Sequence, residues 1–390
     1  MYTMHPVIVF GSYRLDPERL PPDEFEERLR AVRAVMRREG WHGLVVHGDA
    51  QDSALLTWLT NAFPRLRFQL VLVGLEGEPI VIAAGSTRDL PAAAALTWCR
   101  SFCSFNDAPR LLAGFQVQIS AGLPAGQQPT VAVHGLQRMR LSVRATVREA
   151  LGEALADANP SLDPLLQAKR PRELSVMRDA HVLLGRAVQA LRAAWLSGRP
   201  VKAAVREAEH AARRNEAQDV RILFSLDGGA SLQPFESNGD TRGSRLVCLV
   251  AVRYLGYWAQ AYLTEGAADS AAYRAAWGQL QSLRASVRPG VTGRALAAAL
   301  PALPPGCAPH PICEGRLAHG VGLCLDEQPW ITSHTDEIFR EGGVYVLRAG
   351  CSTGPGDAAL LSRTVCIVDG HVRDLETLVG LESPLNSRYA

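Results

Sequence analysis

Apolar residues in the first part of the chain recur at two different spacings. One set follows intervals of three or four residues, which predicts a helix, and Gly40 ends it. Its members are Phe25, Leu29, Val32 and Met36. Short apolar runs predict strands at residues 44–46, 69–73, 80–82 and 130–133, the second and third joined as a hairpin across the turn at 76–79. Helices alternating with strands predict an α/β fold.

A long apolar stripe runs from Leu174 to Trp195 at helical spacing, and it predicts a long helix. His181 lies on this stripe, so we expect a hydrogen-bonded core histidine there. Residues 151–171 contain several prolines, which are typical of a segment between domains. We therefore predict a domain boundary near residue 165, with domains 1–165 and 166–390. Further helices are predicted at 202–216, 271–287 and 294–300, and strands at 220–224, 246–252, 344–347 and 364–368.

Composition and charge narrow the class of protein. The chain has 390 residues, 47% of them hydrophobic and 21% charged, with a formal net charge of +2, which is typical of a globular protein of about two domains. This charge predicts no nucleic-acid or membrane partner, and no apolar run is long enough for a membrane span. Residues 1–14, with their apolar run 6–10, lack signal-peptide features, and the eight cysteines are scattered without a CxxC pair. We therefore expect a cytoplasmic protein without structural zinc.

Several motifs occur in one order along the chain. Lys169–Arg178 reads K-R-P-R-E-L-S-V-M-R, Gly243–Gln260 is an apolar stretch with interspersed glycines and aromatics, and 319–322 reads H-G-V-G. Together with 43–46 and 55–59, these stretches resemble the pita-bread superfamily of creatinase, prolidase, aminopeptidase P and methionine aminopeptidase. The resemblance implies a creatinase-like N-terminal α/β domain, then a pita-bread domain with a curved antiparallel sheet flanked by paired helices. It also implies a homodimer.

The chain departs from this family at the metal ligands. The resemblance implies two divalent metals held by two aspartates, a histidine and two glutamates, which help to generate a hydroxide nucleophile. At the five matching positions this chain has Leu249, Gln260, His319, Arg348 and Ser362. Only the histidine is retained, and a neutral histidine alone does not hold such a cation. We therefore predict no catalytic metal and no cofactor.

The loss of carboxylates changes the expected charge of the site. A neutral or locally basic pocket favours an anionic or neutral polar ligand, which makes a small molecule the expected partner. His319 is the candidate acid or base. The predicted substrate-binding residues are Tyr257, Gln260, Asp326, Glu327, Arg348 and Ser362.

Each of these assignments has a structural alternative. Arg348 lines the site only if the strand register holds, because a slip of one residue would turn it outward. We expect Arg363 to face away. Asp326 or Glu327 would orient His319, or else would be a surface acid. The histidine that serves metal-free creatinase has no counterpart, since Phe235 or a neighbour stands at its position.

Three functions remain open on the sequence. The first is a metal-independent hydrolase or lyase that acts on a small amide, guanidino or carboxylate compound through His319. The second is a catalytically inactive, peptidase-like pseudoenzyme that binds or scaffolds, as peptidase-like domains in some histone chaperones do. An Xaa-Pro dipeptidase or aminopeptidase is less well supported, and a nucleophilic Cys324 or Cys351 paired with His319 is a further alternative. His319 facing Asp326 or Glu327 would favour chemistry, whereas filling of the site by Leu249, Phe235 and Trp258 would favour a scaffold.

Overall fold

The computed structural model describes residues 15–64, 67–85, 90–228, 231–234, 242–266, 270–313, 315–354 and 356–375. The chain forms two compact units, 1–166 and 167–390. The predicted apolar run 6–10 and Phe235 lie outside the described residues. Within the described part, no helix combines the length and the apolar character that crossing a membrane requires.

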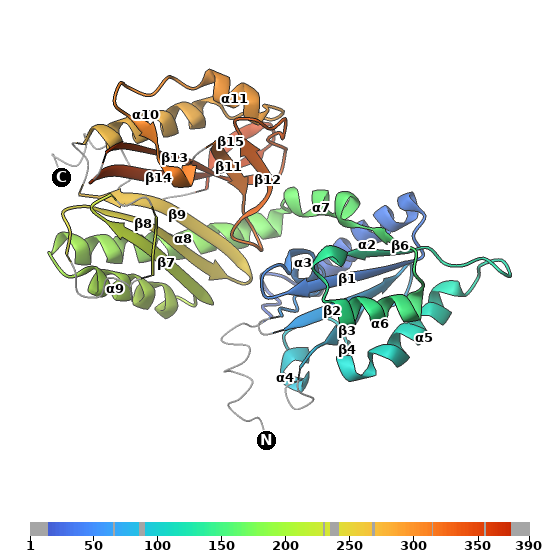
Figure 1. The fold of residues 1–390 in the computed structure, drawn as a ribbon. Helices are drawn as coiled ribbons and strands as arrows, with labels where there is room; N and C mark the ends of the chain where they lie inside the picture. The colour runs from blue at the N-terminus through green and yellow to red at the C-terminus, as the bar shows by residue number, and fades with distance from the viewer. Residues whose placement is uncertain are drawn as a thin grey trace. The chain divides into compact units, whose positions relative to one another are not determined.

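The first unit is built on one mixed sheet with the strand order β4-β3-β2-β1-β5-β6 (Figure 1). Its strands are β1 (Gly43–Asp49), β2 (Phe68–Gly74), β3 (Ile80–Ala83), β4 (Ser101–Ser104), β5 (Val131–His134) and β6 (Leu155–Asp157). Its helices are α2 (Pro22–Glu39), α3 (Ala54–Thr60), α4 (Leu90–Ala94), α5 (Ala108–Ser120), α6 (Leu141–Leu151) and α7 (Asn159–Gln167). The antiparallel β2–β3 hairpin matches the predicted one. The proline-punctuated segment near the boundary nevertheless contains a helix, α7, with Pro164 inside it.

The second unit contains two antiparallel sheets flanked by helices, which confirms the predicted fold class. The first sheet has the order β7-β8-β9, with β7 (Asp219–Leu226), β8 (Leu246–Tyr254) and β9 (Tyr257–Glu265). The second has the order β12-β11-β13-β14-β15, and β10 pairs with β13. Its strands are β10 (Ala308–Pro309), β11 (Arg316–Gly320), β12 (Glu327–Thr332), β13 (Val344–Gly354), β14 (Asp357–Val368) and β15 (His371–Asp374).

Each sheet of this unit has one face covered by helices. Figure 1 shows α8 (Pro171–Leu196) and α9 (Val201–Arg214) beside the first sheet, and α10 (Ala271–Ser286) and α11 (Gly293–Ala299) beside the second. Alternate residues of β8 and β9, such as Cys248 and Ala261, pack with α8 and α9. Alternate residues of β13 and β14, such as Leu347 and Leu361, pack with α10. The remaining residues of these strands form what we call the inner faces.

Helix α8 confirms the long amphipathic helix that the sequence predicts. Pro171 occupies the first turn, where no backbone N–H is needed, and the Glu173 carboxylate accepts a hydrogen bond from the Arg170 backbone N–H. His181 is buried on the apolar stripe, and its Nδ1 lies 2.8 Å from the Met177 carbonyl oxygen. Burial lowers the pKa of His181 to about 4, so this residue is the neutral core histidine that was expected.

The two sheets are joined along β9, an edge strand of the first sheet. Every second residue of β9 contacts the second half of the unit through a hydrogen bond. The Trp258 N–H donates to the Gly322 carbonyl at 2.7 Å, and the Tyr262 N–H donates to Ser362 Oγ at 2.8 Å. The Gln260 side-chain amide donates to the Leu325 carbonyl at 2.6 Å. These bonds satisfy edge groups that would otherwise be buried without partners.

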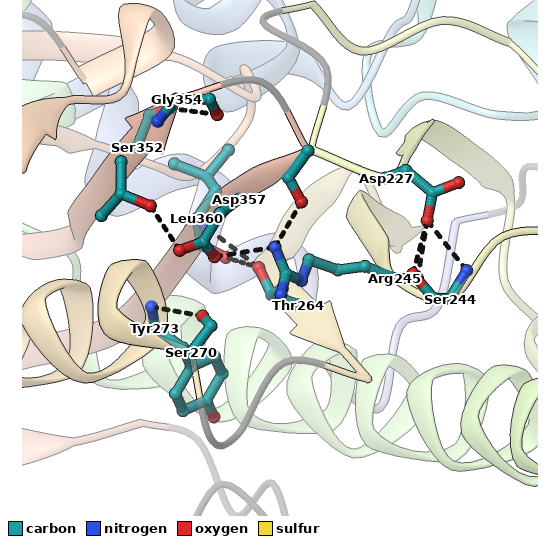
Figure 2. Close-up of polar contacts among 12 residues, drawn as sticks. Asp227, Ser244, Arg245, Thr264, Ser270, Tyr273, Ser352, Gly354, Asp357 and Leu360 are labelled. Atoms are coloured by element: carbon teal, nitrogen blue, oxygen red, sulfur yellow. Dashed lines mark hydrogen bonds and ion pairs between the residues drawn. The ribbon is translucent and has the colours of Figure 1, made fainter.

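Thr264 ends this series with a reciprocal pair of bonds. Its hydroxyl donates to the Leu360 carbonyl at 3.1 Å and accepts from the Leu360 N–H at 2.9 Å. Figure 2 shows this pair beside Arg245, whose guanidinium donates to Asp357 at 2.7 Å. Asp227 in turn accepts from the backbone and side chain of Ser244. The seam between the sheets therefore ends in a cluster of hydrogen-bonded polar groups.

We expect the Thr264 hydroxyl to contribute more to stability than its methyl group does. Thr264→Val is isosteric but leaves two backbone groups of Leu360 without partners, so the free energy of unfolding should fall by about 1–3 kcal/mol. Thr264→Ser keeps the hydroxyl and serves as the control. Denaturant unfolding of both variants measures the difference, and a serine variant at least as unstable as the valine variant would contradict the prediction.

Candidate functional site

The five positions matched to the family's metal ligands come together on the inner faces. Leu249 lies on β8 and Gln260 on β9, while His319, Arg348 and Ser362 lie on β11, β13 and β14. Arg348 and Ser362 are directly opposite one another, so their side chains share a face. His319 is opposite Val346, two residues from Arg348, and therefore projects from the same face. Five strands thus bring the retained histidine and its substituted companions into one site.

His319 and Gln260 form the polar contact at the centre of this site. The Gln260 side-chain nitrogen lies 2.9 Å from His319 Nε2 and 2.6 Å from the Leu325 carbonyl oxygen. A carbonyl oxygen only accepts, so this nitrogen is correctly assigned as the amide NH₂ group, and it donates to both. His319 Nε2 is therefore an acceptor, and its proton sits on Nδ1. Nδ1 is buried without a hydrogen-bond partner among the described residues.

The charge state of His319 follows from its burial. Desolvation lowers the pKa of His319 to about 4, Asp326 opposes this shift, and Arg348 and Arg316 reinforce it. The imidazole is therefore neutral near pH 7. A neutral imidazole whose Nε2 already accepts a hydrogen bond is a weak general base, but its Nδ1–H remains a donor.

Arg348 is buried on the inner face, with 5% of its surface exposed. Its guanidinium interacts with the Tyr262 hydroxyl, where burial raises the tyrosine pKa and Arg348 opposes that rise. Arg348 Nε has no hydrogen-bond partner among the described residues. Arg363, by contrast, is opposite Leu347 on the outer face and lies 3.5 Å from Asp374. The register thus turns Arg348 inward and Arg363 away.

Leu249 fills its position with apolar contacts. It is 6% exposed and packs with Tyr262, Cys313 and Leu360 in a small hydrophobic cluster. Trp258, also on the inner face, is buried, with the Arg253 guanidinium 5.5 Å from its ring centroid. An isobutyl group packed in this way offers no ligand and contributes to stability instead.

The two acids after the H-G-V-G motif bond away from His319. Glu327 accepts from Lys169 at 2.7 Å, in an ion pair that is largely buried. Asp326 accepts from the Trp330 indole N–H at 2.8 Å, on the exposed side of β12. A Cβ at Gly322 would lie 2.7 Å from Lys169 Nζ and 2.9 Å from Glu327 Oε2, so a side chain at this position would displace the ion pair. Neither acid is hydrogen-bonded to His319.

The other predicted site residues have structural partners as well. Tyr257 is buried, and its hydroxyl donates to Glu173 at 2.9 Å, which ties β9 to α8. Ser362 accepts from the Tyr262 backbone. Cys351 lies on the outer face among the side chains packed with α10, and burial raises the pKa of its thiol to about 11. Cys351 is therefore not a partner for His319, which projects from the inner face.

The donor set at these five positions does not fit the metals that the resemblance implies. It offers an imidazole whose Nε2 is already hydrogen-bonded, an amide, a hydroxyl, an alkyl group and a cationic guanidinium. Divalent metals need several anionic or strongly donating ligands, and a guanidinium repels them. Among the described residues, no three His, Cys, Asp or Glu side chains lie together so that they could hold a metal ion.

Comparison with known proteins decides the family. Residues 175–370 match the profile of metallopeptidase family M24, which is half of the chain. The chain belongs to metallopeptidase family M24. This membership confirms the resemblance to the pita-bread superfamily. No curated protein sequence matches the chain significantly.

Solved structures resemble the M24 chain over most of its length. Dipeptidase PepE from Mycobacterium ulcerans is 19% identical, with a TM-score of 0.67, over 93% of this chain and 97% of that one. A prolidase from Pyrococcus furiosus is 16% identical, with a TM-score of 0.66, over 89% and 98%. The N-terminal domain of the FACT complex subunit SPT16 from Cicer arietinum is 16% identical, with a TM-score of 0.67, over 91% and 96%. At such identities these similarities establish the fold.

Sequence reasoning missed two residues of this M24 site. The first is Tyr262, whose hydroxyl contacts the guanidinium of Arg348. Tyr262 lies two residues after Gln260 on β9, so the two side chains project from the same face of the strand. This two-residue spacing could have identified Tyr262 as a site residue. Lys169, the partner of Glu327, belongs to the K-R-P-R-E motif that was used only for family resemblance. A pairing across 158 residues leaves no local signal in the sequence.

We expect the His319 imidazole to remain neutral between about pH 5 and pH 8. Its ring C–H resonances, assigned through their loss in His319→Gln, should titrate near the lowered pKa of about 4 in NMR spectra. Gln260→Glu places a carboxylate beside Nε2 and should raise this midpoint, since an opposite charge favours the protonated ring. A wild-type midpoint near 6.5, or an unchanged midpoint in Gln260→Glu, would contradict the described geometry.

Proposed function

We propose that this M24 chain is a metal-free pseudopeptidase whose pita-bread unit binds a small polar or anionic molecule without the hydrolytic chemistry of a metallopeptidase. One observation carries the proposal. The five metal-ligand positions converge on one site, yet they hold an alkyl group, an amide, a neutral imidazole, a guanidinium and a hydroxyl. The amide and the hydroxyl are occupied by hydrogen bonds that join the two sheets.

A metal-independent enzyme that uses His319 is the second candidate, and the site supports it less well. Its carboxylate partners would be Asp326 or Glu327, but these bond to Trp330 and Lys169. The low pKa of His319, about 4, also makes the ring a poor base near neutral pH. An Xaa-Pro peptidase, the activity named for several structural neighbours, would need carboxylates that this site lacks.

Sequence resemblance and composition further predict a creatinase-like domain at residues 1–165, a homodimer and a cytoplasmic location.

We expect the protein, purified without chelator and dialysed against Mn²⁺, to retain no stoichiometric metal by elemental analysis and to cleave no Xaa-Pro dipeptide. The matched variant carries Leu249→Asp, Gln260→Asp, Arg348→Glu and Ser362→Glu, which rebuilds the acidic ligand set around His319. This variant should gain Mn²⁺ binding by calorimetry, with circular dichroism to check folding. Stoichiometric metal together with cleavage in the unmodified protein would overturn the proposal. A folded variant without metal affinity would show that the five positions do not converge as described.

A further inference from the structure

We propose that the inner face at Arg348 is a receptor for the carboxylate group of a small molecule. The inference rests on the proposed function and names the chemical class of its ligand. Arg348 is 5% exposed and forms no ion pair with a carboxylate among the described residues. Its Nε–H also lacks a hydrogen-bond partner there. An arginine cannot shed its charge, so burial without a counterion is costly to the unliganded fold.

Other arginines of this unit meet a partner. Arg192 pairs with Glu265, and Arg245 with Asp357. Buried Arg253 donates its Nε–H to the Gly256 carbonyl at 3.0 Å. Arg245 Nε and Arg253 Nη2 are also buried without a hydrogen-bond partner among the described residues, but each of these guanidiniums has a carboxylate or carbonyl acceptor elsewhere. Arg348 differs because, within the described part of the chain, it meets the Tyr262 hydroxyl but no carboxylate or carbonyl acceptor.

Two further donors accompany the guanidinium on the inner faces. His319 Nδ1 carries the ring proton, because Nε2 accepts from Gln260, and this N–H is buried without a partner among the described residues. Tyr262 lies against Arg348, where its oxygen can only accept from the guanidinium, so the phenolic proton remains to be donated. The site therefore presents N–H and O–H groups from three strands, and no carboxylate among the described residues is hydrogen-bonded to any of them.

A monocarboxylate fits this set better than a cation or a dianion does. A cation is repelled by Arg348, and a phosphate dianion would carry one negative charge more than the single buried guanidinium balances. A carboxylate matches that charge, and its two oxygens match the planar donor fork of arginine. The charge of Asp326 acts to raise the pKa values of His319 and Tyr262. The Asp326 carboxylate is nevertheless hydrogen-bonded to the Trp330 indole on the exposed side of β12 and not to Arg348.

Thermal unfolding of the full chain tests the inference with acetate as the probe, against chloride at equal ionic strength. For so small a ligand we expect a Kd on the order of millimolar. At about 100-fold excess over Kd, the melting temperature of the unmodified protein should rise by about 5–10 °C. Arg348→Met should abolish this rise, and Arg348→Lys, which lacks the fork, should reduce it. Arg363→Met is the matched control, because Arg363 lies on the outer face beside Asp374, and it should retain the full rise.

A second readout separates binding from a structural role. If Arg348 serves a ligand, removing its unpaired charge should leave the melting temperature of Arg348→Met in chloride at or above that of the unmodified protein. A clear fall in chloride would assign Arg348 to the fold and overturn the inference. So would an absent acetate effect in the unmodified protein, an equal effect in Arg348→Met, or a larger effect of phosphate than of acetate. These results leave the metal-free proposal standing, which only the Mn²⁺ and cleavage assays overturn.

Discussion

The two sheets of the second unit are held together by hydrogen bonds along strand β9, which is an edge strand of the first sheet. Four successive inner-face residues of β9 make that junction, through the Trp258 and Tyr262 backbones and the Gln260 and Thr264 side chains. All four contacts are hydrogen bonds between uncharged groups. Each adds about 1 kcal/mol when made, and costs about 1–3 kcal/mol when one buried partner is left without the other. The site is therefore part of the structure that holds the two sheets together.

This constraint explains why the changes at the metal-ligand positions form a consistent set. Four carboxylates around one histidine, without cations, would be desolvated and would repel one another. In this chain Gln260 instead donates to His319 and to the Leu325 carbonyl, and Ser362 accepts from β9. Leu249 joins an apolar cluster. Three of the four substitutions thus satisfy the fold by themselves, whereas Arg348 does not.

The sequence predicts the fold where one periodicity dominates and motifs retain their order. Helix α8 and strand β8 follow the predicted spans closely. Strand β14 begins at Asp357 rather than near residue 364, because Ser362 and Arg363 interrupt the apolar run from which the strand was predicted. The partners of the site residues could not be predicted in this way. That Glu327 meets Lys169 rather than His319 depends on contacts between distant elements, and the direction of Arg348 depends on the β13–β14 register.

The acids that follow the H-G-V-G motif already have partners of their own and therefore do not neutralise Arg348. Glu327 is paired with Lys169, and Asp326 with the Trp330 indole. Moving the Glu327 carboxylate to Arg348 would break its ion pair with the buried Lys169 ammonium, so the energetic cost would be transferred rather than removed. A fold that satisfies its other substituted positions locally, but keeps one buried guanidinium with no counterion among the described residues, is less stable than it could be. Such a cost is typical of binding sites, where the missing interaction is supplied by the ligand.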